Sequence, residues 1–373
     1  MRLALRLARK GAGNTSPNPM VGAVIVKGTR IIGQGWHHRA GEPHAEIEAL
    51  RDAANKEHSP AGATLYVTLE PCSTRGRTGP CTEAILQAGI SRVIVGATDP
   101  NPKHKGRGFK LLRDAGIRVE AGKLAEECEV LNETFNHWVV HRTPHVTVKA
   151  AMTLDGKIAT ASGESKWITG PAARRAGMEL RRKADAILVG INTVLADDPS
   201  LTLRRAGAPK PVPLRRIILD SMARTPLDAR VISDEHANLT TIVVSRAAPK
   251  SRVKALARRV TVLVAPLQRM TKLANSGSVR ALDLRWVLKR LGNEQVTSLL
   301  VEGGGEVNAS FLMDGLAHRI AFFYAPKVLG GRAARRAVAG EGATCWKETL
   351  RLQDLRWKKL GEDLFLSAKV LPF

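Results

Sequence analysis

The sequence predicts an α/β protein built from two domains, residues 1–143 and 144–373. At 373 residues the chain is longer than one ordinary hydrophobic core requires. Apolar strand-like runs alternate with helix-like segments in both halves, a pattern typical of α/β folds. Pro144 disfavours a continuous helix, so the boundary is expected in the segment 141–146.

The first domain is expected to alternate helices and strands from its first residues. Leu3 and Leu7, with two alanines beside them, form one face of a first helix that ends near Gly11. This interpretation is preferred to a targeting peptide, because the segment has no long apolar centre or cleavage site. Pro43 is expected as the first residue of the next helix. The other expected elements are strands at 21–26, 30–36, 63–69, 92–97 and 117–122, and helices at 82–89 and 108–116.

The second domain begins a new α/β series. Two polar segments rich in Pro, Gly and Ser, 204–214 and 266–280, are predicted to be surface loops. The expected strands are 146–154, 184–191, 215–220, 240–245, 259–265, 298–304 and 319–330.

Composition narrows the classes of function. The net charge of +24 attracts anions, and residues 144–373 carry most of it. Aromatic residues make up only 4%, so small phosphorylated ligands are favoured over nucleic acid as partners. The sequence has no apolar run of membrane-spanning length. Four cysteines in so long a chain do not form a disulfide framework, which favours a cytoplasmic protein. Composition leaves open whether the chain forms a homo-oligomer.

The motifs Pro-His-Ala-Glu and Pro-Cys-x8-Cys predict a catalytic zinc site. His44, Cys72 and Cys81 supply three ligands and leave a fourth position open, whereas a structural site needs four protein ligands. Both His44 and Cys81 are expected near helix N-termini, where positive potential favours thiolates. Glu46 lies two residues beyond the histidine and can move a proton between the attacking water and a leaving amine. This donor set matches that of the zinc deaminases as a class.

The first domain resembles the deaminase half of the bifunctional riboflavin-biosynthesis deaminase–reductases. The runs that carry the resemblance are TSPNPMVGAVIV, GQGWHHRAGEPHAE, TLEPCSTRGRTGPCTEAI and ATDPNPKHKGRG. It implies a fold like that of cytidine deaminase, an α/β/α sandwich, and hydrolytic loss of the 2-amino group from a diaminopyrimidinone that carries a ribosylamino 5′-phosphate. On this resemblance Asn18 and His37 hold the base and Arg77 helps to bind the phosphate. At position 74 the family usually has a histidine, whereas this chain has Thr74. Because a hydroxyl can still donate or accept one hydrogen bond, we expect the deaminase activity or its base selectivity to be altered rather than lost.

The second domain resembles the reductase half of the same family. The runs KAAMTLDGKIATASGESKWITG, GINTVLADDPSLTLR and LLVEGGGEVNASFL carry this resemblance. It implies a fold like that of dihydrofolate reductase and reduction of the ribosyl group to a ribityl chain by NADPH. A glycine-rich turn at Gly303 follows a strand and precedes a helix, so its amides can hold a cofactor phosphate. The Rossmann fingerprint G-x-G-x-x-G is absent.

The resemblance also assigns binding roles in the second domain. Arginine suits the phosphate because its planar fork matches phosphate geometry. The expected substrate residues are Ser165, Arg181, Leu201, Arg204 and Glu302. The expected cofactor residues are Ala151, Trp167, Thr193, Asp197, Ser221, Gly304, Gly305 and Glu306. Lys149 and Asp155 lie in the same motif and are given no catalytic role.

Two other functions stay open at this point. One is a nucleic-acid-editing zinc deaminase whose basic second half binds the polynucleotide, although such enzymes use a Pro-Cys-x2-Cys spacing. The other is a homologue in which only one domain is active, which Thr74 favours. The preferred interpretation is a two-step enzyme that needs zinc and NADPH.

Overall fold

The structure is a computed structural model that describes residues 1–74, 79–102, 104–203, 213–269 and 280–371. It divides into two compact units, Met1–Arg142 and Thr143–Phe373. Among the residues that it describes, no helix is both long and apolar enough to cross a bilayer.

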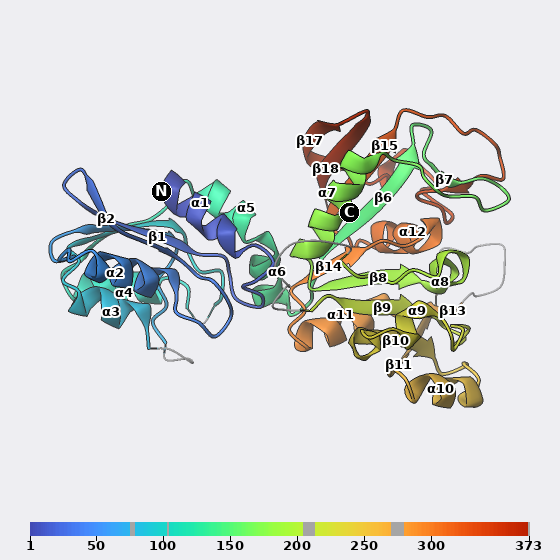
Figure 1. The fold of residues 1–373 in the computed structure, drawn as a ribbon, viewed down its shortest axis with the longest axis horizontal. Helices are drawn as coiled ribbons and strands as arrows, with labels where there is room; N and C mark the ends of the chain where they lie inside the picture. The colour runs from blue at the N-terminus through green and yellow to red at the C-terminus, as the bar shows by residue number, and fades with distance from the viewer. Residues whose placement is uncertain (75–78, 103, 204–212, 270–279, 372–373) are drawn as a thin grey trace. The chain divides into compact units, whose positions relative to one another are not determined.

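The first unit is built on a five-stranded sheet with helices on both faces (Figure 1). The strand order is β2-β1-β3-β4-β5, with β1 antiparallel to both neighbours and β3, β4 and β5 parallel. The strands are β1 (Gly22–Lys27), β2 (Arg30–Trp36), β3 (Thr64–Leu69), β4 (Arg92–Ala97) and β5 (Arg118–Glu120). The helices are α1 (Arg2–Ala8), α2 (Ala45–Asn55), α3 (Cys81–Gln87), α4 (Arg107–Asp114), α5 (Ala125–Leu131) and α6 (Glu133–His141), with a 3₁₀ turn η1 (Arg9–Gly11).

Glycines let two helices approach this sheet closely. A Cβ on Gly22 would collide with the backbone of α1 at Ala4, and one on Gly35 would collide with α2 at Ala49. Gly22 and Gly35 lie on opposite faces, because Gly35 pairs with Ala23 and neighbouring residues alternate. The predicted α/β/α sandwich is therefore confirmed for this unit.

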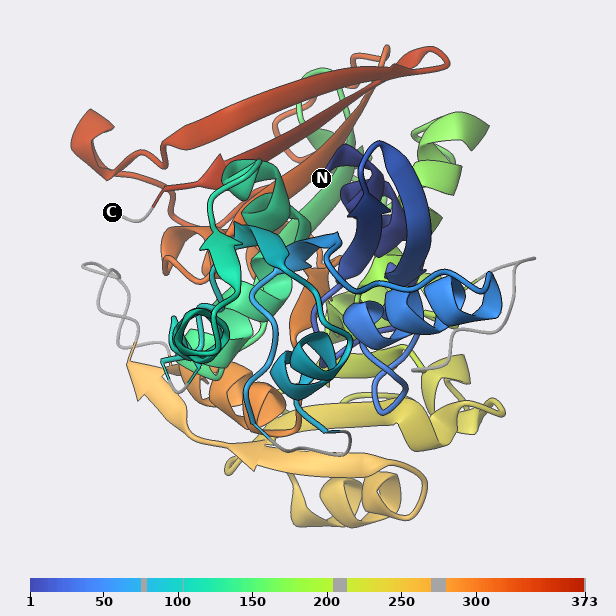
Figure 2. The same cartoon turned by 90° about the vertical axis from the view of Figure 1, so that its left-hand side faces the viewer.

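The second unit contains a nine-stranded sheet in the order β11-β10-β9-β8-β14-β6-β15-β18-β17. All neighbours from β11 to β15 are parallel, whereas β18 is antiparallel to β15 and β17. Figure 2 shows β17 and β18 (red) side by side. The strands are β6 (His145–Thr153), β8 (Ala186–Gly190), β9 (Arg215–Leu219), β10 (Thr240–Ser245), β11 (Thr261–Ala265), β14 (Ser298–Val301), β15 (Arg319–Ala325), β17 (Leu352–Leu360) and β18 (Asp363–Val370).

Helices and two small sheets complete the second unit. Each small sheet is an antiparallel pair, β12 with β13 and β16 with β7. The helices are α7 (Pro171–Lys183), α8 (Ile191–Asp197), α9 (Arg230–Ser233), α10 (Lys250–Ala257), α11 (Leu284–Asn293) and α12 (Gly305–Met313), with 3₁₀ turns η2 (Ala237–Leu239) and η3 (Trp346–Glu348). The short strands are β7 (Lys157–Ala159), β12 (Leu267–Arg269), β13 (Arg280–Leu282) and β16 (Arg335–Arg336).

Two sequence expectations need correction. Pro43 is not the first residue of α2, because the helix begins at Ala45 with His44 as its N-cap. The carbonyl of Pro43 lies 3.0 Å from Nδ1 of His37 and accepts from that side chain, while the carbonyl of His44 accepts the first helical bond from Glu48. The segment 266–280 is not a loop at its ends, since β12 and β13 pair there. The predicted loop at 204–214 lies mostly outside the described residues.

Candidate active sites

His44, Cys72 and Cys81 come from three separate elements and meet at one point in the first unit. His44 caps α2, Cys72 follows β3, and Cys81 is the first residue of α3. Nδ1 of His44 lies 3.2 Å from Sγ of Cys81 and 3.5 Å from Sγ of Cys72. The backbone N–H of Cys81 donates to Sγ of Cys72 at 3.2 Å.

The geometry of these donors fits a zinc ion. All three ligand atoms lie within 4.8 Å of one another. Tetrahedral zinc, with bonds near 2.3 Å to sulfur and 2.0–2.1 Å to nitrogen, places its ligand atoms about 3.3–3.8 Å apart. Hydrogen bonding between the sulfurs lowers the pKa of Cys72 to about 4 and raises that of Cys81, so one thiolate is already favoured. A cation at this point favours the second thiolate as well.

Glu46 lies next to the three donors in the first turn of α2. Its side chain is buried, with a residue exposure of 3%. Burial and the neighbouring Cys72 raise its pKa to about 7. A carboxyl group with such a pKa can both accept and release a proton at neutral pH.

Asn18 and His37 are brought to the same site. Nδ2 of Asn18 lies 3.1 Å from Nε2 of His37, and the His37 ring meets the His44 ring edge to face at 5.3 Å. His37 is buried, and burial lowers its pKa. These two side chains therefore border the ligand set, as expected for residues that hold a base. Thr74 is exposed, and Arg77 lies outside the described residues.

The buried carboxylate of Glu70 is a feature that the sequence analysis missed. It accepts from the backbone N–H groups of Asp99, Gly106 and Gly108, at 3.1, 3.0 and 3.0 Å. Glu70 precedes Pro71 and Cys72, so one side chain ties the loop after β4 to the ligand-bearing loop after β3. Its only sequence signal is a charged residue at the end of an apolar strand.

The second unit contains a cavity of about 1240 Å³ along α7 and the loop after α8. Seven of the predicted binding residues line it: Ala151, Trp167, Arg181, Thr193, Asp197, Leu201 and Glu302. The others are not among the described residues of its lining: Ser165, Ser221, Gly304, Gly305 and Glu306. Arg204 lies outside the described residues.

Glu302 joins two cations at the cavity. Glu302 follows β14. Its carboxylate accepts hydrogen bonds from Nε and Nη2 of Arg181 at 2.8 and 3.1 Å and from Nζ of Lys149 at 3.3 Å. Burial by itself raises the pKa of Glu302, but Lys149 and Arg181 outweigh it and lower the pKa to about 2. One carboxylate beside two cations leaves a net positive charge, which suits an anionic ligand.

The glycine turn after β14 has the predicted strand–turn–helix setting. Gly304 caps α12, and the helix begins at Gly305. A Cβ on Gly305 would collide with the carbonyl oxygen of Arg336, so a close backbone approach requires glycine there. Gly304 has open space around its Cβ position. The turn can receive a ligand group, although the cavity lining does not extend to it among the described residues.

Comparisons with known proteins identify the family of each unit. A family model described as the cytidine and deoxycytidylate deaminase zinc-binding region matches residues 1–97, and one described as the RibD C-terminal domain matches residues 144–366. The riboflavin biosynthesis protein RibD of Aquifex aeolicus is 43% identical over 99% of this chain and 97% of its own length. That of Actinobacillus pleuropneumoniae is 41% identical over 100% of this chain and 94% of its own length.

Solved structures show the same relationship over the full chain. Acinetobacter baumannii RibD, form 1, has a TM-score of 0.85 and 35% identity, covering 99% of this chain and 97% of its own. A diaminohydroxyphosphoribosylaminopyrimidine deaminase/5-amino-6-(5-phosphoribosylamino)uracil reductase from Thermotoga maritima has a TM-score of 0.81 and 34% identity, covering 100% and 97%. These matches do not favour a nucleic-acid-editing deaminase. The chain belongs to the RibD family of riboflavin biosynthesis proteins, bifunctional enzymes that join a deaminase domain to a reductase domain.

Proposed function

We propose that this chain catalyses two consecutive steps of riboflavin biosynthesis. The first is hydrolytic deamination of 2,5-diamino-6-(5-phosphoribosylamino)pyrimidin-4(3H)-one. The second is NADPH-dependent reduction of that product to 5-amino-6-(5-phosphoribitylamino)uracil. The observation that carries the proposal is the set His44, Cys72 and Cys81 beside the buried carboxyl of Glu46. The name of the Thermotoga maritima relative, a deaminase/reductase, supports the pairing of the two activities.

In the deaminase unit, His44, Cys72 and Cys81 hold the metal and Glu46 moves the proton. Zinc bound by these donors supplies a nucleophile from water near neutral pH. Glu46 takes the proton of the attacking water and returns it to the exocyclic nitrogen as the C–N bond breaks, so that ammonia leaves and a ring carbonyl remains. Asn18 and His37 orient the ring through their hydrogen-bonding edges.

In the reductase unit, the chain's own groups bind and orient the reactants. When bound, NADPH would supply the hydride for C1′ of the ribosylamino group in its open imine form and become NADP⁺, while the nitrogen would take up a proton from solvent. Lys149 and Arg181 attract the phosphorylated substrate, since within the described part of the chain one carboxylate, Glu302, forms ion pairs with both of them. Trp167, Thr193 and Asp197 line the cavity where the cofactor is proposed to bind. The cavity exceeds the ~300–1,000 Å³ of typical small-molecule sites, so it can receive substrate and nicotinamide together.

The proposal includes a small-molecule partner and action in the cytoplasm. Both catalytic units present concave or buried sites, and their ligands would be single molecules rather than a polynucleotide. None of the four cysteines forms a disulfide, which suits a reducing compartment.

The proposal is tested by comparing Glu46→Gln with Glu48→Gln. Glu48 lies on the same helix and pairs with Arg51 at 3.0 Å, so it serves as a matched control. We expect Glu46→Gln to retain about one zinc per chain and to lose deamination by at least ~100-fold. It should still reduce the deaminated intermediate when that compound is supplied with NADPH. Deamination by Glu46→Gln at the rate of Glu48→Gln would refute the assigned role.

A further inference from the structure

The loop after α8 forms one wall of the reductase cavity. Asp198, Pro199, Ser200 and Leu201 all line it. Asp198 has φ of 38° and Leu201 has φ of 51°, both in the left-handed region. A branched side chain such as leucine is disfavoured in that region, so contacts from outside the loop must hold this conformation.

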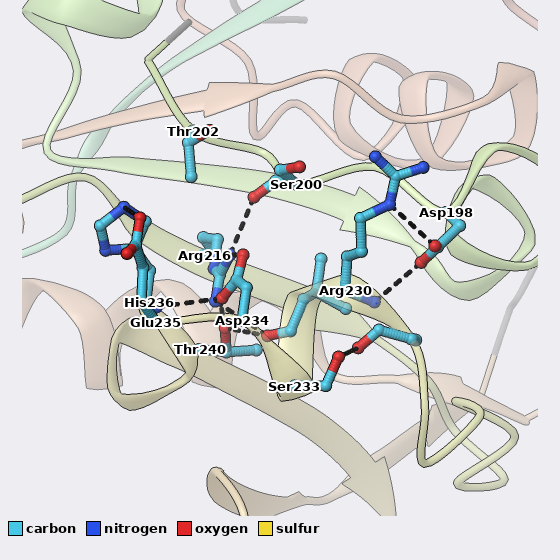
Figure 3. Close-up of polar contacts among 12 residues, drawn as sticks. Asp198, Ser200, Thr202, Arg216, Arg230, Ser233, Asp234, Glu235, His236 and Thr240 are labelled. Atoms are coloured by element: carbon cyan, nitrogen blue, oxygen red, sulfur yellow. Dashed lines mark hydrogen bonds and ion pairs between the residues drawn. The ribbon is translucent and has the colours of Figure 1, made fainter.

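Three arginines hold alternate residues of this loop. The backbone N–H and Nε of Arg230 donate to the Asp198 carboxylate at 2.8 and 2.9 Å. Nη1 of Arg216 donates to the carbonyl of Ser200 at 2.8 Å, and Nη1 of Arg181 donates to the carbonyl of Thr202 at 3.1 Å. Figure 3 shows the first two of these contacts. The loop is therefore held at three alternate residues, Asp198, Ser200 and Thr202.

Arg216 differs from the other two because it holds the loop from inside the protein. Its exposure is 1%, and neither Arg216 nor Asp234 is among the described residues that line the cavity, whereas Arg181 and Arg230 are. An effect of Arg216 on substrate binding must therefore act through the loop, not through contact with the substrate.

Every N–H donor of Arg216 has an acceptor. Besides Ser200, Nε donates to Oγ1 of Thr240 at 2.8 Å, and Nη2 donates to the carbonyl of Val231 at 2.9 Å. Nη1 and Nη2 donate to the two carboxylate oxygens of Asp234 at 2.7 and 2.8 Å (Figure 3). These five bonds use the full capacity of a guanidinium, which the three donors of a lysine cannot replace.

We propose that Arg216 is a positioning residue of the reductase, which fixes the cavity wall at Pro199–Leu201 by holding the Ser200 carbonyl. Asp234 acts one step further away by holding the guanidinium in place. The role of this wall in binding the phosphorylated pyrimidine rests on the proposed function. The attachment of the loop to Arg216 can be tested without any catalytic activity.

The test compares Arg216→Lys with Arg215→Lys in the full chain. Arg215 is the next residue on β9 and pairs with Glu294 at 2.6 Å, so it matches Arg216 in type, strand and ion pairing. We expect the backbone amides of residues 198 and 200–203 to exchange with deuterium at least ~10-fold faster in Arg216→Lys, and as in the wild type in Arg215→Lys. Equal exchange in the two variants would overturn the proposal.

Steady-state kinetics separate positioning from a merely structural role. For reduction of the deaminated ribosylamino phosphate, we expect Arg216→Lys to raise KM by about 10-fold or more, with kcat within about 2-fold. Kinetics equal to those of Arg215→Lys, or a fall in kcat at unchanged KM, would contradict the proposal.

Two further outcomes distinguish a failed variant from a failed proposal. If Arg216→Lys fails to fold, Asp234→Asn replaces it. We expect faster amide exchange in the loop and a raised KM in that variant as well. Exchange in the loop equal to that of the wild type would count against the proposal. If the wild-type chain does not reduce the compound at all, the proposed function is wrong, and the exchange measurement alone decides whether Arg216 holds the loop.

Discussion

Glu302 shows how one residue organises the reductase site. Its carboxylate lies between Lys149 and Arg181, and Arg181 in turn reaches the carbonyl of Thr202. Removal of one partner from a buried ion pair leaves an uncompensated charge, which is strongly destabilising. The charge of Glu302 therefore contributes to the stability of the folded unit as well as to its site.

This contribution should depend on pH in a defined direction. The pKa of Glu302 is about 2 in the folded chain against an ordinary value of 4.5, so the stabilisation is present above pH 4.5 and is lost as the pH falls toward 2. We expect Glu302→Gln to be less stable than the wild type by roughly 3 kcal/mol near neutral pH, and the difference to shrink below pH 4.5. Urea unfolding followed by pulsed hydrogen exchange on β14 peptides measures this for the second unit alone.

Glu341→Gln, at an exposed position, is the control for that experiment. It should differ little from the wild type at any pH. If the stability difference between Glu302→Gln and the wild type stayed constant from pH 7 to pH 3, it would contradict the charged state assigned to Glu302.

At the residue scale, the sequence was informative where a function needs particular residue types in a short motif. His44, Glu46, Cys72 and Cys81 were predicted as a group, and the structure brings them together. Glu70 was missed because it accepts from backbone N–H groups of a distant segment, and Arg216 because its backbone and side-chain partners lie in separate segments of the chain. Such partners leave no residue-type signature in a single sequence.

At the scale of elements, the deaminase site depends on loops that follow two neighbouring parallel strands. β3 and β4 end at the same edge of the sheet, and Glu70 joins the loops that follow them. The loop after β4 and the first turn of α4 are thereby held beside the ligand-bearing loop, by two hydrogen bonds from the loop and one from Gly108 of the helix to one carboxylate.

Replacement of Glu70 by glutamine should loosen this connection. The amide nitrogen of glutamine cannot accept from a backbone N–H, so at least one buried donor loses its partner. We expect a loss of about 1–3 kcal/mol in the stability of the first unit, measured by urea unfolding with exchange probes on β3. Glu120→Gln, in a solvent-accessible ion pair on β5, should change the stability much less, because water screens such pairs. Equal losses in the two variants would contradict the role of Glu70.

Most strands were predictable because they are apolar runs, whereas several other elements were not. α5, α6 and α7 were not expected, since their sequences mix charged and apolar residues, although Pro171 at the first position of α7 is a signal that could have marked its start. The pairing of β17 with β18 also escaped the sequence analysis, because β17 is almost wholly exposed and lacks an apolar run. When both faces of an edge strand are exposed, apolar and polar residues no longer alternate along it, and strand prediction depends on that alternation.

At the scale of the whole molecule, two different chemistries share one chain. The first unit contains the His/Cys/Cys set, and the second contains the cavity around Glu302. Length, alternation and Pro144 predicted two domains, and family-like motifs predicted the kind of each. A single sequence could not show which of the predicted residues share the reductase cavity. Leu201 lies in the loop after α8 and lines the cavity, whereas Ser221 follows β9 and is not part of its lining.

The most direct test of the central claim follows the pyrimidine by mass in zinc-loaded wild-type protein, with and without NADPH. Supplied with the diaminopyrimidinone ribosylamino phosphate, the enzyme should form the deaminated ribosylamino compound when NADPH is omitted. With NADPH present, that compound should be replaced by the ribitylamino product, with a gain of two hydrogens. Absence of deamination, or deamination with no reduction on adding NADPH, would contradict a two-step enzyme.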